Sequence, residues 1–197
     1  MELIARIDAA RARWNVLDHP FYRRWERGEL TRDELGYYAG QYRHAVVALA
    51  DAAVTAAPLA GPEHAEEERA HVGLWDDFAA ELGIVGKREP NTDTAACARA
   101  WTAASDELEA LAILYAVESG QPDVSRTKLA GLAEHYGIGG ESPAAAYFAL
   151  HAERDVEHAD EARTVLEQQV GAEDEDRLVA AAESALRGNW RLLDGVA

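Results

Sequence analysis

Apolar residues recur along this chain at the three- and four-residue spacing of amphipathic helices. The first such helix is predicted over residues 2–15, where one side is apolar: Leu3, Ile4, Ile7 and Ala10. A short aromatic helix follows within residues 19–28 and ends at a glycine. Thr31 and Glu34 then match the S/T-x-x-E pattern of a capping box, which predicts the start of a long helix that ends near Pro58.

Glycine and proline residues divide the rest of the chain into further helical segments. The predicted connections are Gly61-Pro62, the polar run 86–93, the Gly-Gln-Pro-Asp segment 120–123 and the glycine-rich stretch 137–143. The helices between them are expected over residues 63–82, 93–104, 105–119, 124–136, 144–170 and 174–193. Because no repeat, long linker or low-complexity tract interrupts this pattern, we expect residues 1–197 to form one compact, all-α helical bundle.

The composition agrees with a helical domain and limits the class of partner. The chain has 197 residues, enough for a substantial core, and 48% of them are hydrophobic, with alanine and leucine prominent. The formal net charge of −17 argues against nucleic acid or an anionic membrane as a partner. We expect a cytoplasmic protein, because the sequence shows neither a signal-peptide apolar region nor the roughly 20 apolar residues of a membrane span.

The strongest candidate for chemistry is a polar stripe on the predicted helix 144–170. His151, Asp155 and His158 follow one another at spacings of four and three residues, which place all three side chains on one face of a helix. Two imidazoles and a carboxylate on one face suit a transition metal. One helix cannot easily complete such a site, so we expect further ligands from other helices.

A second candidate pair lies on the predicted helix 63–82. Glu68 and His71 have the Glu-x-x-His spacing with which di-metal helical bundles project ligands inward. This helix carries other acidic residues, so the identity of the carboxylate ligand stays open between Glu68 and the following: Glu63, Glu66 and Glu67. Alone, such a run of glutamates is more often a solvated helix face.

Glu118 is the third signal, because it continues the apolar face formed by Leu111, Leu114 and Tyr115. A carboxylate on such a face is costly to bury unless it is paired or bound to a metal, although it could also cap the helix end. The candidate ligands are then Glu68, His71, Glu118, His151, Asp155 and His158. Six nitrogen and oxygen ligands without a thiolate suit two metal ions, two irons or iron and manganese, better than a single zinc.

Three segments of the sequence resemble a known family, and the resemblance covers nearly the whole chain. His19-Pro-Phe-Tyr-x-x-Trp-x-x-Gly-x-Leu-Thr is similar to the TenA/PqqC group of the haem-oxygenase-like fold. Glu118-Ser-Gly-Gln-Pro-x-Val-Ser-x-x-Lys128 and His151-x-x-x-Asp-x-x-His158 resemble the haem-oxygenase-like di-metal oxidases, in particular the CADD-like branch. The resemblance implies a helical bundle, often a homodimer, whose metal pair activates dioxygen with electrons from an external reductant.

The resemblance also implies an unusual substrate. Members of the CADD-like branch are thought to make para-aminobenzoate from one of their own tyrosines, with a lysine donating nitrogen. Tyr22 and Lys128 match the positions of those two residues in this sequence. Considered alone, a tyrosine in His-Pro-Phe-Tyr packs readily in a core and a lysine in Ser-Arg-Thr-Lys is usually exposed. Other tyrosines could serve in place of Tyr22, namely Tyr37, Tyr42 and Tyr115.

Three alternatives follow from the same residues. The metal pair could oxidise an external small molecule in a pocket lined by the long helix predicted to start at Thr31 and by its neighbours. The candidate lining residues are Tyr38, Gln41, His44 and Tyr115. The chain could instead be a metal-free binding protein or a cofactorless PqqC-like enzyme, and pairing of Asp155 with an arginine or lysine would favour this interpretation. Thiaminase-type hydrolysis is disfavoured, because Gln41 is not followed by Asp and the only cysteine, Cys97, has the context of a buried core thiol.

One departure from the family pattern concerns the first carboxylate ligand. The CADD-like branch commonly has a carboxylate seven residues before the histidine that corresponds to His71, and that place is occupied here by His64. We therefore assign Glu68 from its Glu-x-x-His geometry.

Overall fold

The computed structural model describes residues 2–197, so Met1 of the predicted domain lies outside the described residues. These residues form helices without strands, as predicted. In chain order the elements are α1 (Glu2–Arg13), the 3₁₀ turn η1 (Val16–Asp18), α2 (Pro20–Glu26), α3 (Arg32–Ala60), α4 (Pro62–Glu81), α5 (Thr92–Trp101), α6 (Glu107–Glu118), α7 (Gln121–His135), the 3₁₀ turn η2 (Pro143–Ala145), α8 (Ala146–Gln169) and α9 (Glu175–Asp194). No helix among these residues is long and apolar enough to cross a membrane.

The predicted capping box forms at the start of α3. The Thr31 hydroxyl accepts a hydrogen bond from the Glu34 amide at 3.2 Å, and the Glu34 carboxylate accepts one from the Thr31 amide at 2.7 Å. The helix continues past Pro58 to Ala60 and ends at Gly61, where φ is +90°. A positive φ favours glycine, so Gly61 rather than Pro58 turns the chain into α4.

The start of α7 differs from the prediction. We expected residues 120–123 to be a break, but the helix begins at Gln121 and contains Pro122 in its first turn. Proline is compatible with this position because the first amides of a helix have no intrahelical acceptor. The three additional residues extend α7 back to the end of α6, close to Glu118.

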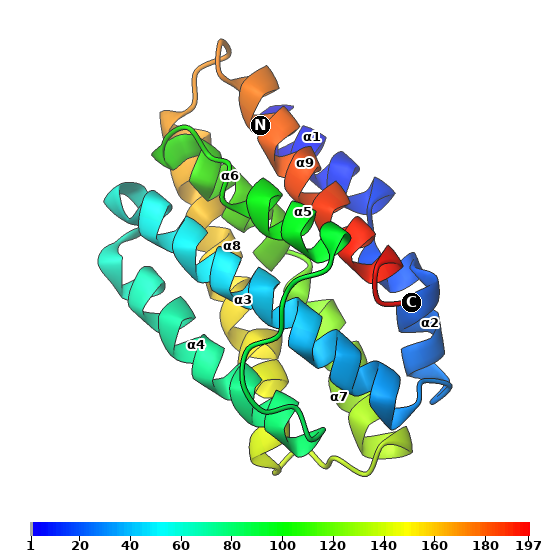
Figure 1. Cartoon of the computed structure of the whole chain (residues 1–197). Helices are drawn as coiled ribbons and strands as arrows, with labels where there is room; N and C mark the ends of the chain where they lie inside the picture. The colour runs from blue at the N-terminus through cyan, green and yellow to red at the C-terminus, as the bar shows by residue number, and fades with distance from the viewer. Residues whose placement is uncertain (1) are drawn as a thin grey trace.

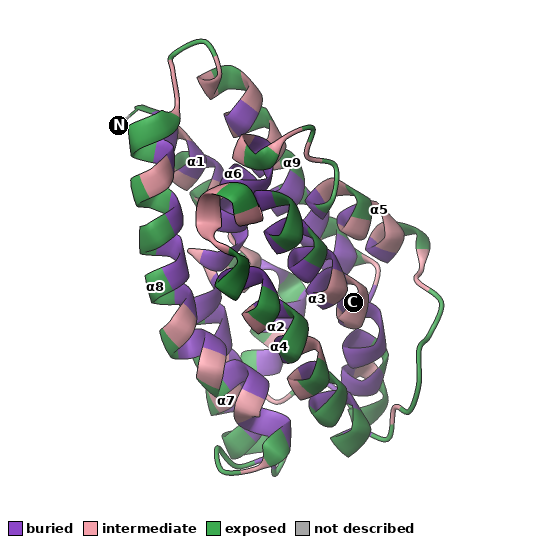
Figure 2. Cartoon of the chain, turned by 90° about the vertical axis from the view of Figure 1, so that its left-hand side faces the viewer, coloured by how far each residue is buried: buried purple, intermediate pink, exposed green. Residues whose placement is uncertain are grey.

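Helix α3 runs through the middle of the bundle and packs against α4, α5 and α6, while α9 covers α5 and α6 and α7 lies along α8 (Figure 1). Each helix turns its buried side toward the interior and its exposed side outward, which Figure 2 shows most clearly along α8. The buried apolar residues form a contiguous core cluster.

A close approach between α2 and α7 brings the N-terminal aromatic residues over Lys128. At Gly131 an added Cβ would lie only 2.6 Å from the ring of Trp25, so only glycine leaves room for this contact. The Trp25 indole donates a hydrogen bond to the Lys128 carbonyl at 3.2 Å. This contact fixes α7 beneath α2 and places the side chain of Lys128 in the core.

Candidate metal centre

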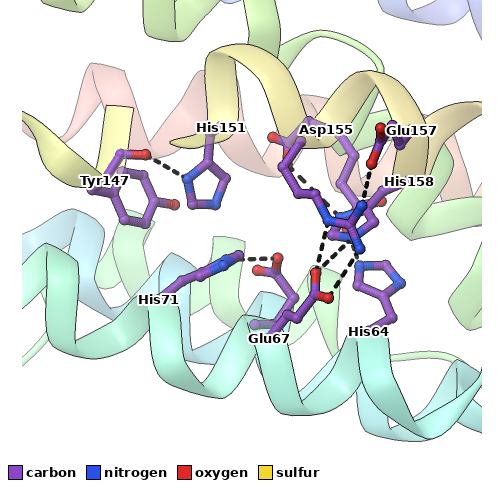
Figure 3. Close-up of polar contacts among 11 residues, drawn as sticks. His64, Glu67, His71, Tyr147, His151, Asp155, Glu157 and His158 are labelled. Atoms are coloured by element: carbon purple, nitrogen blue, oxygen red, sulfur yellow. Dashed lines mark hydrogen bonds and ion pairs between the residues drawn. The ribbon is translucent and has the colours of Figure 1, made fainter. Parts of the chain in front are cut away.

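Polar side chains from α4 and α8 face one another across the interior of the bundle. On α8, His151, Asp155 and His158 share one face as predicted, and all three are buried. On α4, His64, Glu68 and His71 repeat the same four- and three-residue spacing and are also buried. Figure 3 shows the two rows directed toward each other. The C-terminal residue of α6, Glu118, adds a third carboxylate from a third helix.

The ligand atoms form two groups that share a carboxylate. Atoms of His64, Glu68, Glu118 and His158 all lie within 4.8 Å of one another, and so do atoms of Glu68, His71 and His151. Because Glu68 belongs to both groups, its carboxylate could contribute to both sites if two metal ions were bound.

Asp155 accompanies the first group. One oxygen of Asp155 lies 4.0 Å from Nδ1 of His158. The candidate ligands that were predicted on three different helices therefore lie close together in the structure.

Several buried polar atoms of this cluster have no hydrogen-bond partner among the described residues. They are Oε2 of Glu68, both oxygens of Asp155, Oε2 of Glu118, Nε2 of His151 and Nδ1 of His158. Oε1 of Glu68 and Nδ1 of His71 lie 2.9 Å apart, a contact within the cluster. Buried polar atoms are almost always satisfied in folded proteins, because each unsatisfied group costs stability. Oxygen and imidazole nitrogen atoms that converge in this way fit the coordination of transition-metal ions.

The electrostatics of the carboxylates point the same way. Burial raises the pKa of Asp155 well above its ordinary value, and the neighbouring carboxylates Glu118 and Glu68 raise it further. Burial also raises the pKa of Glu118, although its contact with His64 opposes this shift. An ion pair between Asp155 and an arginine or lysine would have favoured a metal-free protein. Among the described residues Asp155 forms no such ion pair. Bound cations would offset the repulsion among these carboxylates.

His151 is held in an orientation suited to metal binding. Its Nδ1 lies 2.6 Å from the carbonyl oxygen of Tyr147, which can only accept, so Nδ1 carries the proton and Nε2 has a free lone pair. Burial lowers the pKa of His151 to about 4, which keeps the imidazole neutral at physiological pH. Neutral imidazole is the form that binds metals.

His64 is the ligand candidate that the sequence analysis did not include. Its Nε2 lies 2.9 Å from Oε1 of Glu118, and its ring centroid is 4.0 Å from that of His158. A signal was present in the sequence, because His64 precedes Glu68 by one helical turn and His71 by two. The other glutamates of α4 have different surroundings: Glu66 and Glu63 are exposed, and Glu67 is paired with Arg154.

Lys128 lies in a cage of aromatic rings next to this cluster. Its side chain is only 1% exposed, and its Nζ is 4.8 to 5.5 Å from the ring centroids of Tyr22, Tyr38, Tyr42, Trp75 and Phe148. Burial lowers the pKa of Lys128 to about 7, so a large share of the amine is neutral near neutral pH.

The aromatic cage is continuous with the cluster of candidate ligands. Tyr147 connects the two, because its ring stacks on His151 at 4.0 Å and lies 4.9 Å from Trp75. Inside the cage the hydroxyl oxygens of Tyr22 and Tyr38 are 3.1 Å apart. The structure therefore brings the predicted pair Tyr22 and Lys128 together beside the candidate ligands.

Three of the four predicted pocket residues lie elsewhere. Tyr38 is part of the cage, but Gln41 bonds the backbone of Asn91 and Glu89, and His44 bonds the carbonyl of Arg88. Tyr38 and Tyr42 are one helical turn apart and face the interior of the bundle. Gln41 and His44 lie on a different side of α3 and form hydrogen bonds with the connection between α4 and α5.

Tyr115 is also placed away from the cage. Its hydroxyl donates to Asp8 of α1 at 3.0 Å. The structure thus places Gln41, His44 and Tyr115 away from the cage. Of the alternative tyrosines, Tyr42 lies in the cage and Tyr37 is 40% exposed.

A cavity of about 600 Å³ reaches the candidate ligands from the surface between α4 and α8. Its lining includes His64 and His158 together with Glu67 and Arg154. The cluster of candidate ligands is therefore adjacent to a space large enough for a small molecule.

Comparison with known proteins agrees with this geometry. The family model described as iron-containing redox enzyme, of the haem oxygenase group, matches residues 61–190, which contain the seven candidate ligands. A 4-aminobenzoate synthase from Chlamydia muridarum is 28% identical over an alignment that covers 98% of this chain and 89% of that protein.

Two solved structures share the fold. A domain of unknown function with a heme oxygenase-like fold from Shewanella denitrificans superimposes with a TM-score of 0.79 at 19% identity, covering all of this chain and 92% of that one. A TenA homologue from P. horikoshii has a TM-score of 0.77 at 16% identity, covering 98% and 97%. The predicted haem-oxygenase-like, TenA-type fold is confirmed.

Proposed function

The chain belongs to the family of iron-containing redox enzymes, and from this premise we propose that it forms 4-aminobenzoate from its own Tyr22 in a dioxygen-dependent reaction. The metal centre would hold two ions, Fe/Fe or Fe/Mn, between α4, α6 and α8. The residues proposed to hold them are His64, Glu68, His71, Glu118, His151, Asp155 and His158. When bound, these ions supply the redox chemistry that activates dioxygen.

The observation that carries this proposal is the enclosure of Lys128 with Tyr22 in one aromatic cage beside the metal cluster. An uncompensated buried lysine is costly, and none of the described carboxylates pairs with Lys128, which implies a use for the amine. A pKa of about 7 leaves part of the amine unprotonated, and only the neutral amine has a lone pair with which to form a bond to carbon.

The atoms of the product can be traced to these two residues. A tyrosine ring with its Cβ contains the seven carbons of 4-aminobenzoate, and the phenolic oxygen stands para to Cβ as the amine stands para to the carboxyl group. The Cα–Cβ bond of Tyr22 must break and leave glycine in its place, Cβ must be oxidised to a carboxyl group, and the phenolic oxygen must leave as water when nitrogen replaces it. The Cε–Nζ bond of Lys128 breaks as Cε is oxidised to an aldehyde. Dioxygen accepts the electrons from both side chains, and an external reductant supplies the remainder needed to reduce it to water.

The cage residues have separate tasks in this reaction. The surrounding rings exclude water from the amine and the phenol, which keeps Lys128 neutral and limits competing hydrolysis. The hydroxyl of Tyr38, 3.1 Å from that of Tyr22, orients the phenol and can exchange a proton with it.

Intact-mass spectrometry on the whole protein tests the proposal. After incubation with ferrous iron, a reductant and oxygen, the chain should lose the Tyr22 side chain and exchange the Lys128 amine for an aldehyde, while 4-aminobenzoate appears in solution. Tyr22→Phe should abolish both changes, whereas Tyr37→Phe, which alters an exposed tyrosine, should not.

The nitrogen donor can be traced because the chain has only two lysines, Lys87 and Lys128. Protein made with ε-¹⁵N-lysine should release ¹⁵N-labelled product. The Lys87→Arg variant, labelled in the same way, should still release ¹⁵N-labelled product. An unchanged chain mass after many hours would refute the role of Tyr22 as the substrate. Unlabelled product would refute the role of Lys128 as the nitrogen donor.

The cavity beside His64 and His158 favours a second candidate function, oxidation of an external small molecule at the same metal centre. In that case the chain mass stays constant and the enzyme turns over repeatedly. The mass measurement therefore separates the two functions.

A further inference from the structure

Glu67 contacts the metal cluster from outside it. Its Oε2 lies 3.1 Å from Nε2 of His158, on the wall of the cavity between α4 and α8 (Figure 3). A carboxylate oxygen that is ionised can only accept a hydrogen bond, so Nε2 of His158 carries the proton. The neutral ring then has its lone pair on Nδ1, the buried atom without a partner.

Arg154 fixes the position of this carboxylate. Its Nε and Nη2 each donate to a different oxygen of Glu67, both at 2.9 Å. Such a two-point contact between a guanidinium and a carboxylate is geometrically specific. Glu157 binds the remaining Nη1 of Arg154, so the arginine is itself held between two glutamates.

The two histidines of α8 are therefore held through opposite ring nitrogens. The Tyr147 carbonyl accepts a hydrogen bond from Nδ1 of His151, and the Glu67 carboxylate accepts one from Nε2 of His158. In each ring the nitrogen that faces the cluster is the unprotonated one, and it has no partner among the described atoms.

From these contacts we infer that Glu67 is a positioning residue of the metal centre, which orients His158 to coordinate through Nδ1 and is held in place by Arg154. The inference rests on the proposed metal centre but not on the proposed product. A carboxylate behind a histidine ligand fixes the tautomer and makes the ring a stronger donor. Glu67 thus acts through His158 and does not itself bind the metal.

Metal binding by four variants of the full chain tests this role. Glu67→Ala removes the acceptor, Glu67→Gln keeps an oxygen but loses the charge that Arg154 requires, and Arg154→Ala frees the carboxylate. Glu66→Ala is the matched control, since Glu66 is the exposed neighbour on α4. Anaerobic competition of ferrous iron against a chelator gives the affinity, and the metal content at saturation gives the stoichiometry.

We expect Glu67→Ala to weaken the affinity by about 10- to 100-fold with the saturating stoichiometry unchanged. Glu67→Gln should lose less, Arg154→Ala only a few-fold, and Glu66→Ala nothing. Circular dichroism of the metal-free variants checks that each is folded.

A spectroscopic readout separates positioning from a general structural effect. In the cobalt(II)-loaded protein, the proton on Nε2 of His158 should give a paramagnetically shifted, exchangeable signal that Glu67 shields from water. This signal should be lost or exchange faster in Glu67→Ala and persist in Glu66→Ala.

Two results would overturn the inference. If Glu67→Ala binds iron as tightly as Glu66→Ala, Glu67 does not position His158. If its saturating metal content falls, Glu67 is itself a ligand. Normal metal binding by the wild type without 4-aminobenzoate formation would refute the proposed product and leave this inference intact, whereas a wild type that binds no metal would refute both.

Discussion

Replacing Lys128 with methionine should stabilise the metal-free protein at neutral pH. The lysine is buried among aromatic rings, no carboxylate of residues 2–197 pairs with it, and its burial lowers its pKa to about 7. Methionine has a similar length, no charge and favourable contacts with aromatic rings, so it should fill the cage without loss of packing.

The magnitude follows from linkage between protonation and folding. The pKa is about 10.5 in the unfolded chain and about 7 in the folded one, and each pH unit between them corresponds to about 1.4 kcal/mol. Below pH 7 the wild type therefore carries a penalty of about 5 kcal/mol, an upper estimate. Because the unfolded state binds the extra proton between these values, wild-type stability should rise with pH through this window. The penalty disappears above pH 10.5.

Urea unfolding of wild type and Lys128→Met at several pH values measures this effect. The difference between the two proteins removes the contribution of all groups that they share. From pH 7.5 to 9.5 the stability advantage of the variant should shrink by about 2.5 kcal/mol. Lys87→Met, in the connection between α4 and α5, should show no such pH-dependent difference.

Two outcomes would refute the reasoning. A variant that is less stable than wild type at pH 7 would show that Lys128 makes favourable interactions in the cage that exceed its desolvation. A stability difference that does not change with pH would show that the amine has an ordinary pKa in the folded protein. In either case Lys128 would not be a neutral, reactive amine near pH 7.

Two further predictions concern the metal centre and the packing that supports the cage. His64→Ala should reduce the metal content after ferrous loading from about two ions per chain toward one, because His64 belongs to only one of the two ligand groups. Inductively coupled plasma mass spectrometry measures the metal content directly, and an unchanged content would remove His64 from the ligand set. Gly131→Ala should cost about 1–3 kcal/mol of stability in urea unfolding, since its Cβ would lie 2.6 Å from Trp25. The control Gly73→Ala, whose Cβ would have no neighbour within 4 Å, should be neutral or stabilising by up to about 1 kcal/mol. Equal effects at both positions would contradict the close approach of α2 and α7.

Much of the fold could be predicted because the sequence signals were local. The capping box at Thr31, the apolar periodicity and the glycine and proline breaks predicted each helix to within a few residues. The starts and ends were less accurate, as at Pro58 and Gln121, because proline is compatible with a first turn and a helix can continue beyond it when a later glycine provides the turn.

The site was predictable where its residues shared a helix. Helical geometry alone placed His151, Asp155 and His158 on one face, and the Glu-x-x-His spacing selected Glu68. The same geometry could not show which way a face points. Gln41 and His44 were therefore assigned to a pocket although they bind the neighbouring connection.

The sequence by itself determined which side chains share a helical face, because about 3.6 residues per turn fix their angular positions within each helix. Only the tertiary structure decided which faces meet. It set His64 against Glu118, 54 positions along the chain, and enclosed Lys128 with residues of α2, α3, α4 and α8. The depth and rotation of each helix depend on the packing of the whole core, and this information is not contained in any single segment.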